Sequence, residues 1–173
     1  MTTDQIQQQK QYLRKHFLDQ RKQLDSSDVA ERSEKLVCLL INEIDWTKTK
    51  TMHCFLPIIG SNEPDMRDLI QHATLKSVKV FMSVPAKPVD KIKGTELKTC
   101  ALGDNTVFDQ IIVPMLAYDP ATKHRLGFGG GFYDQLLASQ KSAQSIGVCF
   151  KEFTAKGLPT ESTDYPLNKI FIS

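Results

Sequence analysis

The residue types best suited to chemistry in this chain lie in one glycine-rich stretch, residues 125–134. It reads Arg-Leu-Gly-Phe-Gly-Gly-Gly-Phe-Tyr-Asp and lies between an apolar run and a helix-like segment. Because glycine loses more conformational freedom on folding than any other residue, such a cluster indicates a loop whose backbone N–H groups closely approach an anion. Arg125 adds a fork of donors that matches phosphate oxygens, and Asp134 adds a carboxylate that could hold a divalent cation. The stretch therefore points to a nucleoside triphosphate with magnesium.

A second interpretation of the same stretch is an ordinary glycine-rich turn whose aromatic side chains only pack. The sequence matches neither standard phosphate motif, because no Gly-Lys-Ser/Thr ends the loop and the pair Gly127 and Gly129 lacks a glycine at the required third place. The residue pattern alone leaves both interpretations open.

Alternating helical and strand-like segments surround this loop. Residues 28–44 carry an apolar stripe at helical spacing, with Asp28 and Glu31 placed as a capping box at its start. Residues 110–116 form a largely apolar run with three consecutive β-branched residues, typical of a strand covered on both faces. The expected helices cover residues 4–24, 28–44, 64–75 and 133–139, and the expected strands cover residues 49–56, 78–84, 110–116, 145–150 and 169–172.

This alternation predicts an α/β fold, with a single domain over residues 1–173, three α/β/α layers and a mostly parallel central sheet. The least legible region is residues 90–109, which alternate only weakly at 95–101. In such folds ligands bind where loops leave the carboxyl ends of strands. The glycine-rich stretch follows one predicted strand and residues 57–64 follow another, so we expect the two loops to share a crevice.

Composition favours a globular, cytoplasmic protein with reduced cysteines. The chain has 173 residues, and its net charge of +2 gives no overall bias toward nucleic acid. Its four cysteines are widely spaced without a C-x-x-C pair, which argues against zinc and disulfide scaffolding, and Cys54 is expected in the core. No apolar run approaches the length of a membrane span, and the first residues lack the apolar segment of a signal peptide.

The approach to the glycine-rich stretch strengthens its interpretation as a ligand loop. Residues 113–119 read Val-Pro-Met-Leu-Ala-Tyr-Asp, and residues 125–134 follow after a short spacer. Together they resemble the signature of the 5-formyltetrahydrofolate cyclo-ligase family, approximately Val-Pro-Gly-Leu-Ala-Phe-Asp, a spacer, then Arg-Leu-Gly-(Arg/Tyr)-Gly-(Lys/Gly)-Gly-Tyr-Tyr-Asp. A match of this length and order is specific. The resemblance implies ATP- and Mg²⁺-dependent cyclisation of 5-formyltetrahydrofolate to 5,10-methenyltetrahydrofolate, with release of ADP and phosphate.

The resemblance also implies roles for individual residues. Lys10 and Arg14 lie four apart on one helical face, where they are expected to grip the phosphates, and Arg125 is expected to be catalytic. Glu63 is expected to orient the folate, beside an apolar wall from Leu56 or Ile58. ATP binding is predicted for Lys10, Arg14, Arg125, Leu126, Gly127, Phe128, Gly129, Gly130, Gly131, Phe132 and Tyr133; folate binding for Ile58, Glu63, Phe128, Gly129, Gly130, Gly131 and Phe132; and magnesium binding for Asp134 and Asp164.

The chain departs from the family pattern in three places. Phe128 and Gly130 stand where many relatives carry arginine or lysine, and Gln135 stands where arginine is common. Residues 87–109 form a shorter region than usual and lack the family's aromatic and Glu-Pro landmarks. The aromatic faces for a pterin ring would then come from Phe128, Phe132 and Tyr133.

Three alternatives remain at this point. The chain could be a diverged family member that binds a nucleotide or another folate without cyclising 5-formyltetrahydrofolate. It could be a nucleic-acid-binding module that uses a basic first helix, whose local patch includes Lys15, Arg21 and Lys22, or a sugar-phosphate isomerase of similar layered fold. The preferred interpretation predicts small-molecule partners, a reduced folate and ATP, with no nucleic acid or membrane partner, and a monomer.

Overall fold

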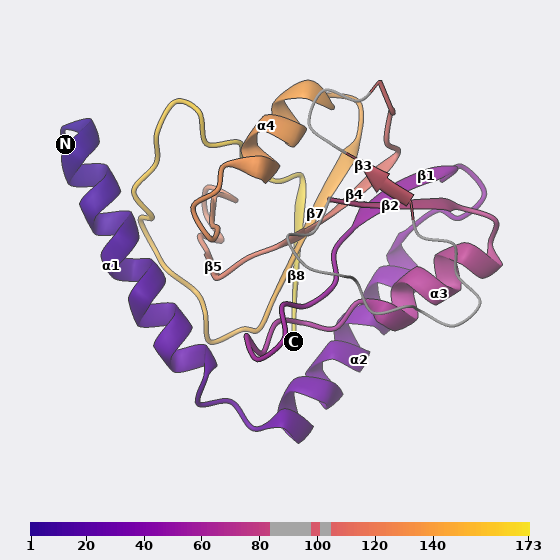
Figure 1. The fold of residues 1–173 in the computed structure, drawn as a ribbon, viewed down its shortest axis with the longest axis horizontal. Coiled ribbons are helices and arrows are strands. Elements are labelled where there is room, and N and C mark those ends of the chain that lie inside the picture. The colour runs from indigo at the N-terminus through magenta and orange to yellow at the C-terminus, as the bar shows by residue number, and fades with distance from the viewer. Residues whose placement is uncertain (84–97, 101–104) are drawn as a thin grey trace.

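The computed structural model describes residues 1–83, 98–100 and 105–173 (Figure 1). Its centre is a six-stranded sheet in which every pair of neighbouring strands runs parallel. The helices are α1 (Thr3–Arg21), α2 (Ser26–Glu43), α3 (Arg67–Leu75) and α4 (Phe132–Ser139). The strands are β1 (Thr51–Cys54), β2 (Lys79–Ser83), β3 (Lys98–Cys100), β4 (Gln110–Pro114), β5 (Ala117–Tyr118), β6 (Arg125–Leu126), β7 (Gln144–Cys149) and β8 (Lys169–Ile172).

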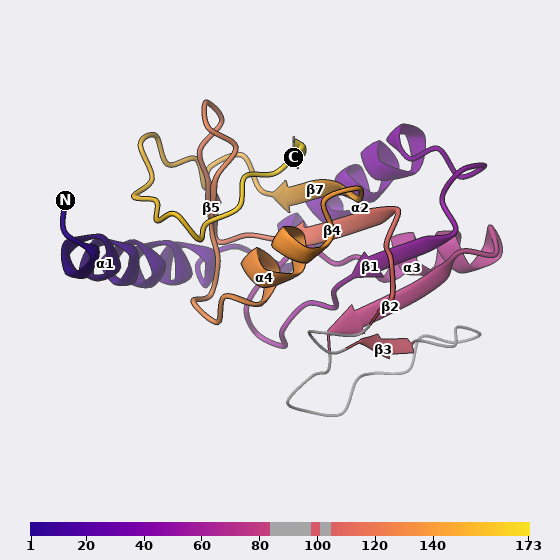
Figure 2. The ribbon, with the colours of Figure 1, turned by 90° about the horizontal axis from the view of Figure 1, so that it is seen from above.

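Helices cover both faces of the sheet, which confirms the predicted α/β fold with its layers and parallel strands. Helices α2 and α3 lie on one face and α4 lies on the other, whereas α1 extends beside the sheet (Figures 1 and 2). The buried strand residues explain this sandwich. Strand β4 is buried along almost its whole length, and β7 carries five consecutive buried residues, as expected for strands packed on both faces.

The strand order is β3-β2-β1-β4-β7-β8, so the direction of winding reverses between β1 and β4. Parallel sheets bind ligands in the crevice beyond the carboxyl ends of the two strands at such a reversal. Residues 55–66 leave β1 at this edge, and the segment that contains the glycine-rich stretch leaves β4 at the same edge. The two loops predicted to share a crevice therefore leave neighbouring strand ends.

Local signals explain where the first two helices begin. The Thr2 side chain accepts a hydrogen bond from the backbone N–H of Gln5, and the Gln5 side chain accepts one from the backbone N–H of Thr2, which makes a capping box at the start of α1. Helix α2 begins two residues earlier than predicted. Its N-cap is Asp25, whose carboxylate accepts from the Ser27 N–H, so the capping box expected at Asp28 is wrong.

The predicted strands and helices occur, with ends shifted by one to three residues, and β8 has the predicted bounds. A small antiparallel ribbon was not predicted. In it, Ala117 pairs with Leu126 and Tyr118 with Arg125, which places Arg125 at the start of the glycine-rich stretch in a fixed backbone. The structure does not describe residues 84–97 and 101–104. Most of residues 90–109, the region whose sequence pattern was hardest to interpret, therefore lies outside the described residues.

The core contains Cys54 as predicted. Its side chain is fully buried, and burial raises the pKa of its thiol to about 12, which argues against a nucleophilic role. Among the described residues, no helix combines the length and apolar content that crossing a membrane requires.

Candidate functional site

A cavity of about 820 Å³ lies between α1, the glycine-rich stretch, the start of α4 and residues 161–165. It brings together segments from the two ends of the chain and its middle. Every residue predicted to bind ATP or magnesium lines it: Lys10, Arg14, Arg125, Leu126, Gly127, Phe128, Gly129, Gly130, Gly131, Phe132, Tyr133, Asp134 and Asp164.

The glycine-rich loop ends at the N-terminus of α4. Gly131 is the N-cap of this helix in a left-handed conformation, with φ of 67°, and it supplies no side-chain cap to the first N–H groups. Gly129 has φ of 101°, a backbone conformation that other L-residues rarely adopt. Uncapped N–H groups at a helix start, behind a loop of this kind, suit a bound anion.

Arg14 joins α1 to this loop. Its Nε–H donates to the Gly127 carbonyl oxygen at 3.0 Å. A Cβ atom on Gly129 would lie only 3.3 Å from the guanidinium carbon of Arg14. The absence of a side chain at Gly129 therefore allows the Arg14 guanidinium to pack against the loop backbone, and the cation lies beside the N–H groups that could hold a phosphate.

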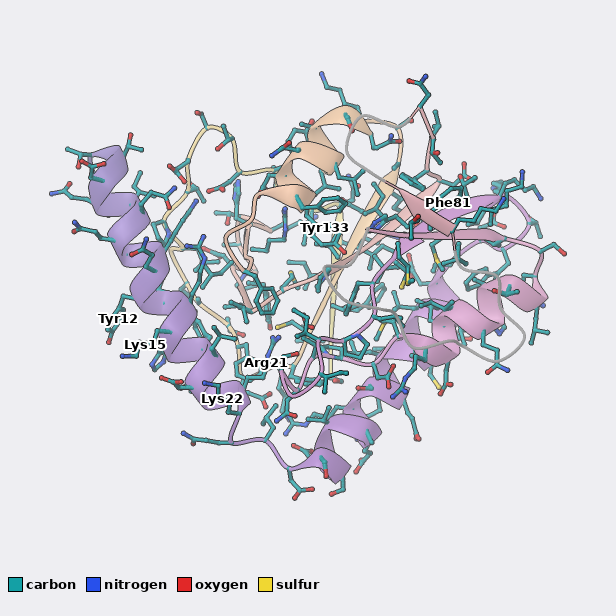
Figure 3. The ribbon with its side chains drawn as sticks, in the orientation of Figure 1. Tyr12, Lys15, Arg21, Lys22, Phe81 and Tyr133 are labelled. Atoms are coloured by element: carbon teal, nitrogen blue, oxygen red, sulfur yellow. The ribbon has the colours of Figure 1, made fainter. Side chains whose placement is uncertain are left out.

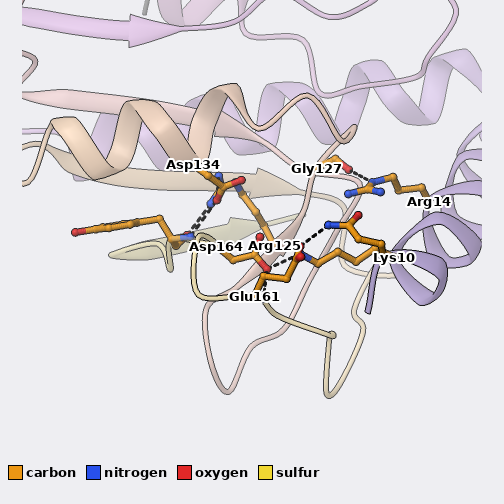
Figure 4. Close-up of polar contacts among 9 residues, drawn as sticks. Lys10, Arg14, Arg125, Gly127, Asp134, Glu161 and Asp164 are labelled. Carbon is orange, nitrogen blue, oxygen red and sulfur yellow. Dashed lines mark hydrogen bonds and ion pairs between the residues drawn. The ribbon is translucent and has the colours of Figure 1, made fainter. Parts of the chain in front are cut away.

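Arg125 is held in one orientation by two partners (Figure 4). Its Nη2 donates to Asp134 Oδ1 at 2.9 Å, and its Nη1 donates to the Tyr165 carbonyl oxygen at 2.7 Å. The same Asp134 oxygen also accepts from the Tyr165 backbone N–H at 3.0 Å. Burial lowers the pKa of the Arg125 guanidinium, and the nearby Asp134 carboxylate opposes that shift. The arrangement fixes a rigid fork of donors at the cavity wall.

Lys10 is paired with two carboxylates across the cavity (Figure 4). Its Nζ lies 2.5 Å from Asp164 Oδ2 and 2.9 Å from Glu161 Oε2, and its side chain is only 6% exposed. Asp164 Oδ2 also accepts from the Glu161 backbone N–H at 2.8 Å. Lys10 and Arg14 thus lie on one face of α1, as predicted, and that face forms a wall of the cavity.

Asp134 and Asp164 both line the cavity, and each could offer one carboxylate oxygen to a magnesium ion that also takes phosphate oxygens as ligands. In each carboxylate one oxygen takes the bonds described above, Oδ1 in Asp134 and Oδ2 in Asp164, which leaves the second oxygen to a metal. Among the described residues, no group of three or more His, Cys, Asp and Glu side chains could hold a metal by itself. Magnesium bound here would need the nucleotide, in keeping with its preference for one or two carboxylates plus phosphate and water.

The residues predicted to contact folate are divided between two places. Phe128 and Phe132 line the cavity with the glycines. Ile58 and Glu63 lie in the loop after β1 and are not part of the cavity wall. Ile58 is 57% exposed, whereas the Glu63 carboxylate is buried and accepts from the Ile58 backbone N–H at 2.7 Å. Burial raises the pKa of Glu63, because taking the charged carboxylate out of water is unfavourable. The loop after β1 holds this carboxylate in place despite that cost.

The sequence suggested that Arg21 belongs to an exposed basic patch on α1, and this prediction is wrong. Its side chain is fully buried, and its Nη2 donates to the Met115 carbonyl oxygen at 2.5 Å. The guanidinium carbon lies 5.1 Å from the centre of the Phe153 ring. Arg21 instead fixes the end of α1 to the sheet, and Figure 3 shows it on the inner side of that helix.

Glu161 and Gln7 were not predicted as site residues. Gln7 Nε2 donates to Glu161 Oε2 at 2.6 Å, and both side chains line the cavity. The available signal was their spacing. Gln7 precedes Lys10 by about one helical turn, and Glu161 precedes Asp164 by three residues in the segment that resembles the family.

Comparisons with known proteins agree with the motif. The model of the 5-formyltetrahydrofolate cyclo-ligase family matches residues 6–173, so the chain belongs to that family. Two curated relatives are 5-formyltetrahydrofolate cyclo-ligases. The one from Saccharomyces cerevisiae is 30% identical over 73 residues, 39% of this chain and 35% of that protein. The one from Haemophilus influenzae is 38% identical over 66 residues, 37% and 35% of the two chains. This chain therefore spans about a third of the length of the curated relatives it matches.

Two solved structures share the fold over nearly the whole chain. A 5,10-methenyltetrahydrofolate synthetase from Mycoplasma pneumoniae superposes with a TM-score of 0.73 at 21% identity, covering 93% of this chain and 96% of that one. A 5,10-methenyltetrahydrofolate synthetase from Aquifex aeolicus superposes with a TM-score of 0.70 at 26% identity, covering 94% and 89%.

Proposed function

We propose that this protein converts 5-formyltetrahydrofolate to 5,10-methenyltetrahydrofolate at the expense of ATP, which leaves as ADP and phosphate. The observation that carries the proposal is the meeting of Lys10, Arg14 and Arg125 around the glycine-rich loop in one cavity. Membership of the family supports the same reaction.

The reaction needs activation of a poor leaving group. The formyl oxygen attacks the γ-phosphorus of ATP, the bond to ADP breaks, and an iminium phosphate forms. The N10 amine then attacks the activated carbon and loses its proton, and phosphate leaves with the former formyl oxygen. The protein mainly has to position the reactants and stabilise charge, as in other phosphoryl transfers.

The cavity residues divide these tasks among them. The loop N–H groups and the fixed fork of Arg125 hold the phosphates, and Lys10 and Arg14 add positive charge from α1. Asp134 and Asp164 would hold Mg²⁺, which neutralises phosphate charge when it is bound. The folate would extend from Phe128 and Phe132, which offer aromatic faces in the cavity, toward the loop after β1, where Glu63 would orient it.

The test is to incubate the purified protein with ATP, Mg²⁺ and 5-formyltetrahydrofolate and to follow the near-ultraviolet chromophore of the methenyl product. Chromophore formation that requires all three additions is the expected result. ATP binding without chromophore formation would favour the alternative, a diverged family member. That alternative has support in residues 87–109, which are shorter than usual for the family.

A further inference from the structure

Glu161 is the charged side chain of the cavity to which the proposed reaction assigns no task. Its Oε2 accepts from Lys10 Nζ at 2.9 Å and from Gln7 Nε2 at 2.6 Å. Lys10 Nζ and the Glu161 carboxylate thus form an ion pair. Glu161 is therefore bound to the Lys10 ammonium group, which the proposed function assigns to a phosphate of ATP.

The charges of the cavity are balanced in this state. Three cationic side chains, Lys10, Arg14 and Arg125, line the cavity with three carboxylates, Asp134, Glu161 and Asp164. Lys10 is almost fully buried, and a buried ammonium group needs anionic partners. A triphosphate that enters the cavity brings several negative charges close to Glu161, and like charges at short range repel.

Asp164 and Glu161 differ in how firmly they are held. Asp164 receives a backbone hydrogen bond, from the Glu161 N–H at 2.8 Å, in addition to its ion pair with Lys10. The two bonds described for the Glu161 carboxylate both come from side chains of α1, those of Gln7 and Lys10. Glu161 can therefore leave Lys10 by a change of side-chain rotamer, whereas Asp164 stays in place beside the metal position.

From this asymmetry we propose that Glu161 is an internal counterion that holds Lys10 in the nucleotide-free protein and is displaced by a phosphate of ATP. The inference rests on the proposed function, because it takes the cavity to be the ATP site. Glu161 then has two effects. It keeps Lys10 ordered before ATP binds, and it lowers the affinity for ATP because its ion pair with Lys10 must be broken.

The experiment compares ATP binding, by titration calorimetry with Mg²⁺, in the wild-type protein and in Glu161→Gln. Glutamine keeps the size and the hydrogen-bonding capacity of the side chain but removes its charge. The dissociation constant of ATP should fall by about three- to tenfold. Glu152→Gln is the matched control, because Glu152 pairs with Arg32 and does not line the cavity. Its ATP affinity should equal that of the wild type.

A second pair of variants tests the exchange at Lys10 itself. Lys10→Met should weaken ATP binding, and adding Glu161→Gln to it should bring a smaller gain than in the wild type, because only repulsion is then relieved and no ion pair with Lys10 has to be broken. Glu161→Asp, with a shorter reach to Lys10, should bind ATP with an intermediate affinity, which provides a second reading if Glu161→Gln folds poorly.

The outcomes separate this inference from the proposed function. If the wild type binds ATP and Glu161→Gln binds it equally or more weakly, the counterion role is overturned while the proposed function stands. An equal gain in the Lys10→Met background would also overturn it, because simple repulsion would then suffice. If neither the wild type nor any variant binds ATP, both proposals fail.

Discussion

At the scale of single residues, the geometry of Arg125 matters as much as its charge. Asp134 and the Tyr165 carbonyl oxygen hold two different nitrogens of the guanidinium. We expect Arg125→Lys to lower kcat/KM by about 100-fold, because lysine keeps the positive charge but cannot make both contacts and face a phosphate. Steady-state kinetics with the chromophore assay measure the change.

The control for that variant is Arg32→Lys, since Arg32 pairs with Asp28 and Glu152 far from the cavity wall. Its kcat/KM should match the wild type. If Arg125→Lys kept the wild-type kcat/KM as Arg32→Lys is expected to, the geometry of the Arg125 guanidinium would not matter for catalysis.

A second residue-scale prediction concerns His53 on β1. Its side chain is fully buried beside Phe108, Phe132 and Tyr133, and neither ring nitrogen has a hydrogen-bond partner among the described residues. Burial lowers the pKa of His53 from 6.5 to about 4. Below pH 6.5 the unfolded chain binds a proton that the native protein refuses, so the free energy of unfolding falls as the pH drops from 6.5 toward 4.

The loss over that window is on the order of 3 kcal/mol for one fully shifted histidine. His53→Leu removes the titrating group and keeps an apolar side chain of similar size. Its free energy of unfolding, measured by urea denaturation at several pH values, should fall less steeply than that of the wild type between pH 6.5 and 4. Parallel curves for the two proteins would show that His53 titrates normally.

At the scale of elements, the loop before α4 depends on particular glycines. Gly129 has φ of 101° and lies against Arg14, whereas Gly130 has an ordinary φ and open space where a Cβ would be placed. Gly129→Ala should therefore cost about 1–3 kcal/mol of stability and weaken ATP binding, because it strains the backbone and displaces Arg14. Gly130→Ala, one residue further on, should leave the free energy of unfolding nearly unchanged.

Urea denaturation and ATP titration of the two variants provide the measurement. Similar losses at both positions would mean that the loop conformation of the structure is not the one that binds ATP.

The elements also show which features the sequence could predict. The strand at residues 169–172 is rich in β-branched and aromatic residues, Ile170, Phe171 and Ile172, and it occurs with its predicted bounds. The ribbon of β5 and β6 was missed because strands of two residues are too short to show any periodicity. The start of α2 was placed two residues too late because Asp25 and Asp28 are both good capping residues.

The residues of the candidate site were likewise predicted from the sequence only in part. The glycine-rich loop and the cations were predicted from a contiguous motif and from helical spacing. The pairing of Lys10 with Glu161 could not be, because the two residues are 151 positions apart and only the folded chain brings them together. Arg21 was misplaced for a related reason: an arginine on a basic helix is normally exposed, and its burial depends on Met115 and Phe153, far along the chain.

At the scale of the whole molecule, the site exists only if α1 is held against the rest of the protein. This helix lies beside the sheet, and it contributes both Lys10 and Arg14 to the cavity (Figures 1 and 4). Its far end is fixed by Arg21, which contacts the segment after β4 and the Phe153 ring. We therefore expect this one buried cation to couple the stability of the protein to the geometry of the cavity.

Arg21→Met tests this coupling, with Lys22→Met as its matched control. Arg21 is fully buried, and its charge partly offsets the cost of the buried Glu63 carboxylate, whereas the Lys22 side chain is 66% exposed and forms a surface ion pair with Asp19. Arg21→Met should lower the free energy of unfolding by about 2–4 kcal/mol, and Lys22→Met by at most about 0.5 kcal/mol. At temperatures where Arg21→Met is still folded, it should also bind ATP more weakly than Lys22→Met, because α1 is no longer anchored at the sheet. Equal unfolding midpoints in urea for the two variants would show that α1 is positioned by its other contacts, and the role assigned to Arg21 would have to be abandoned.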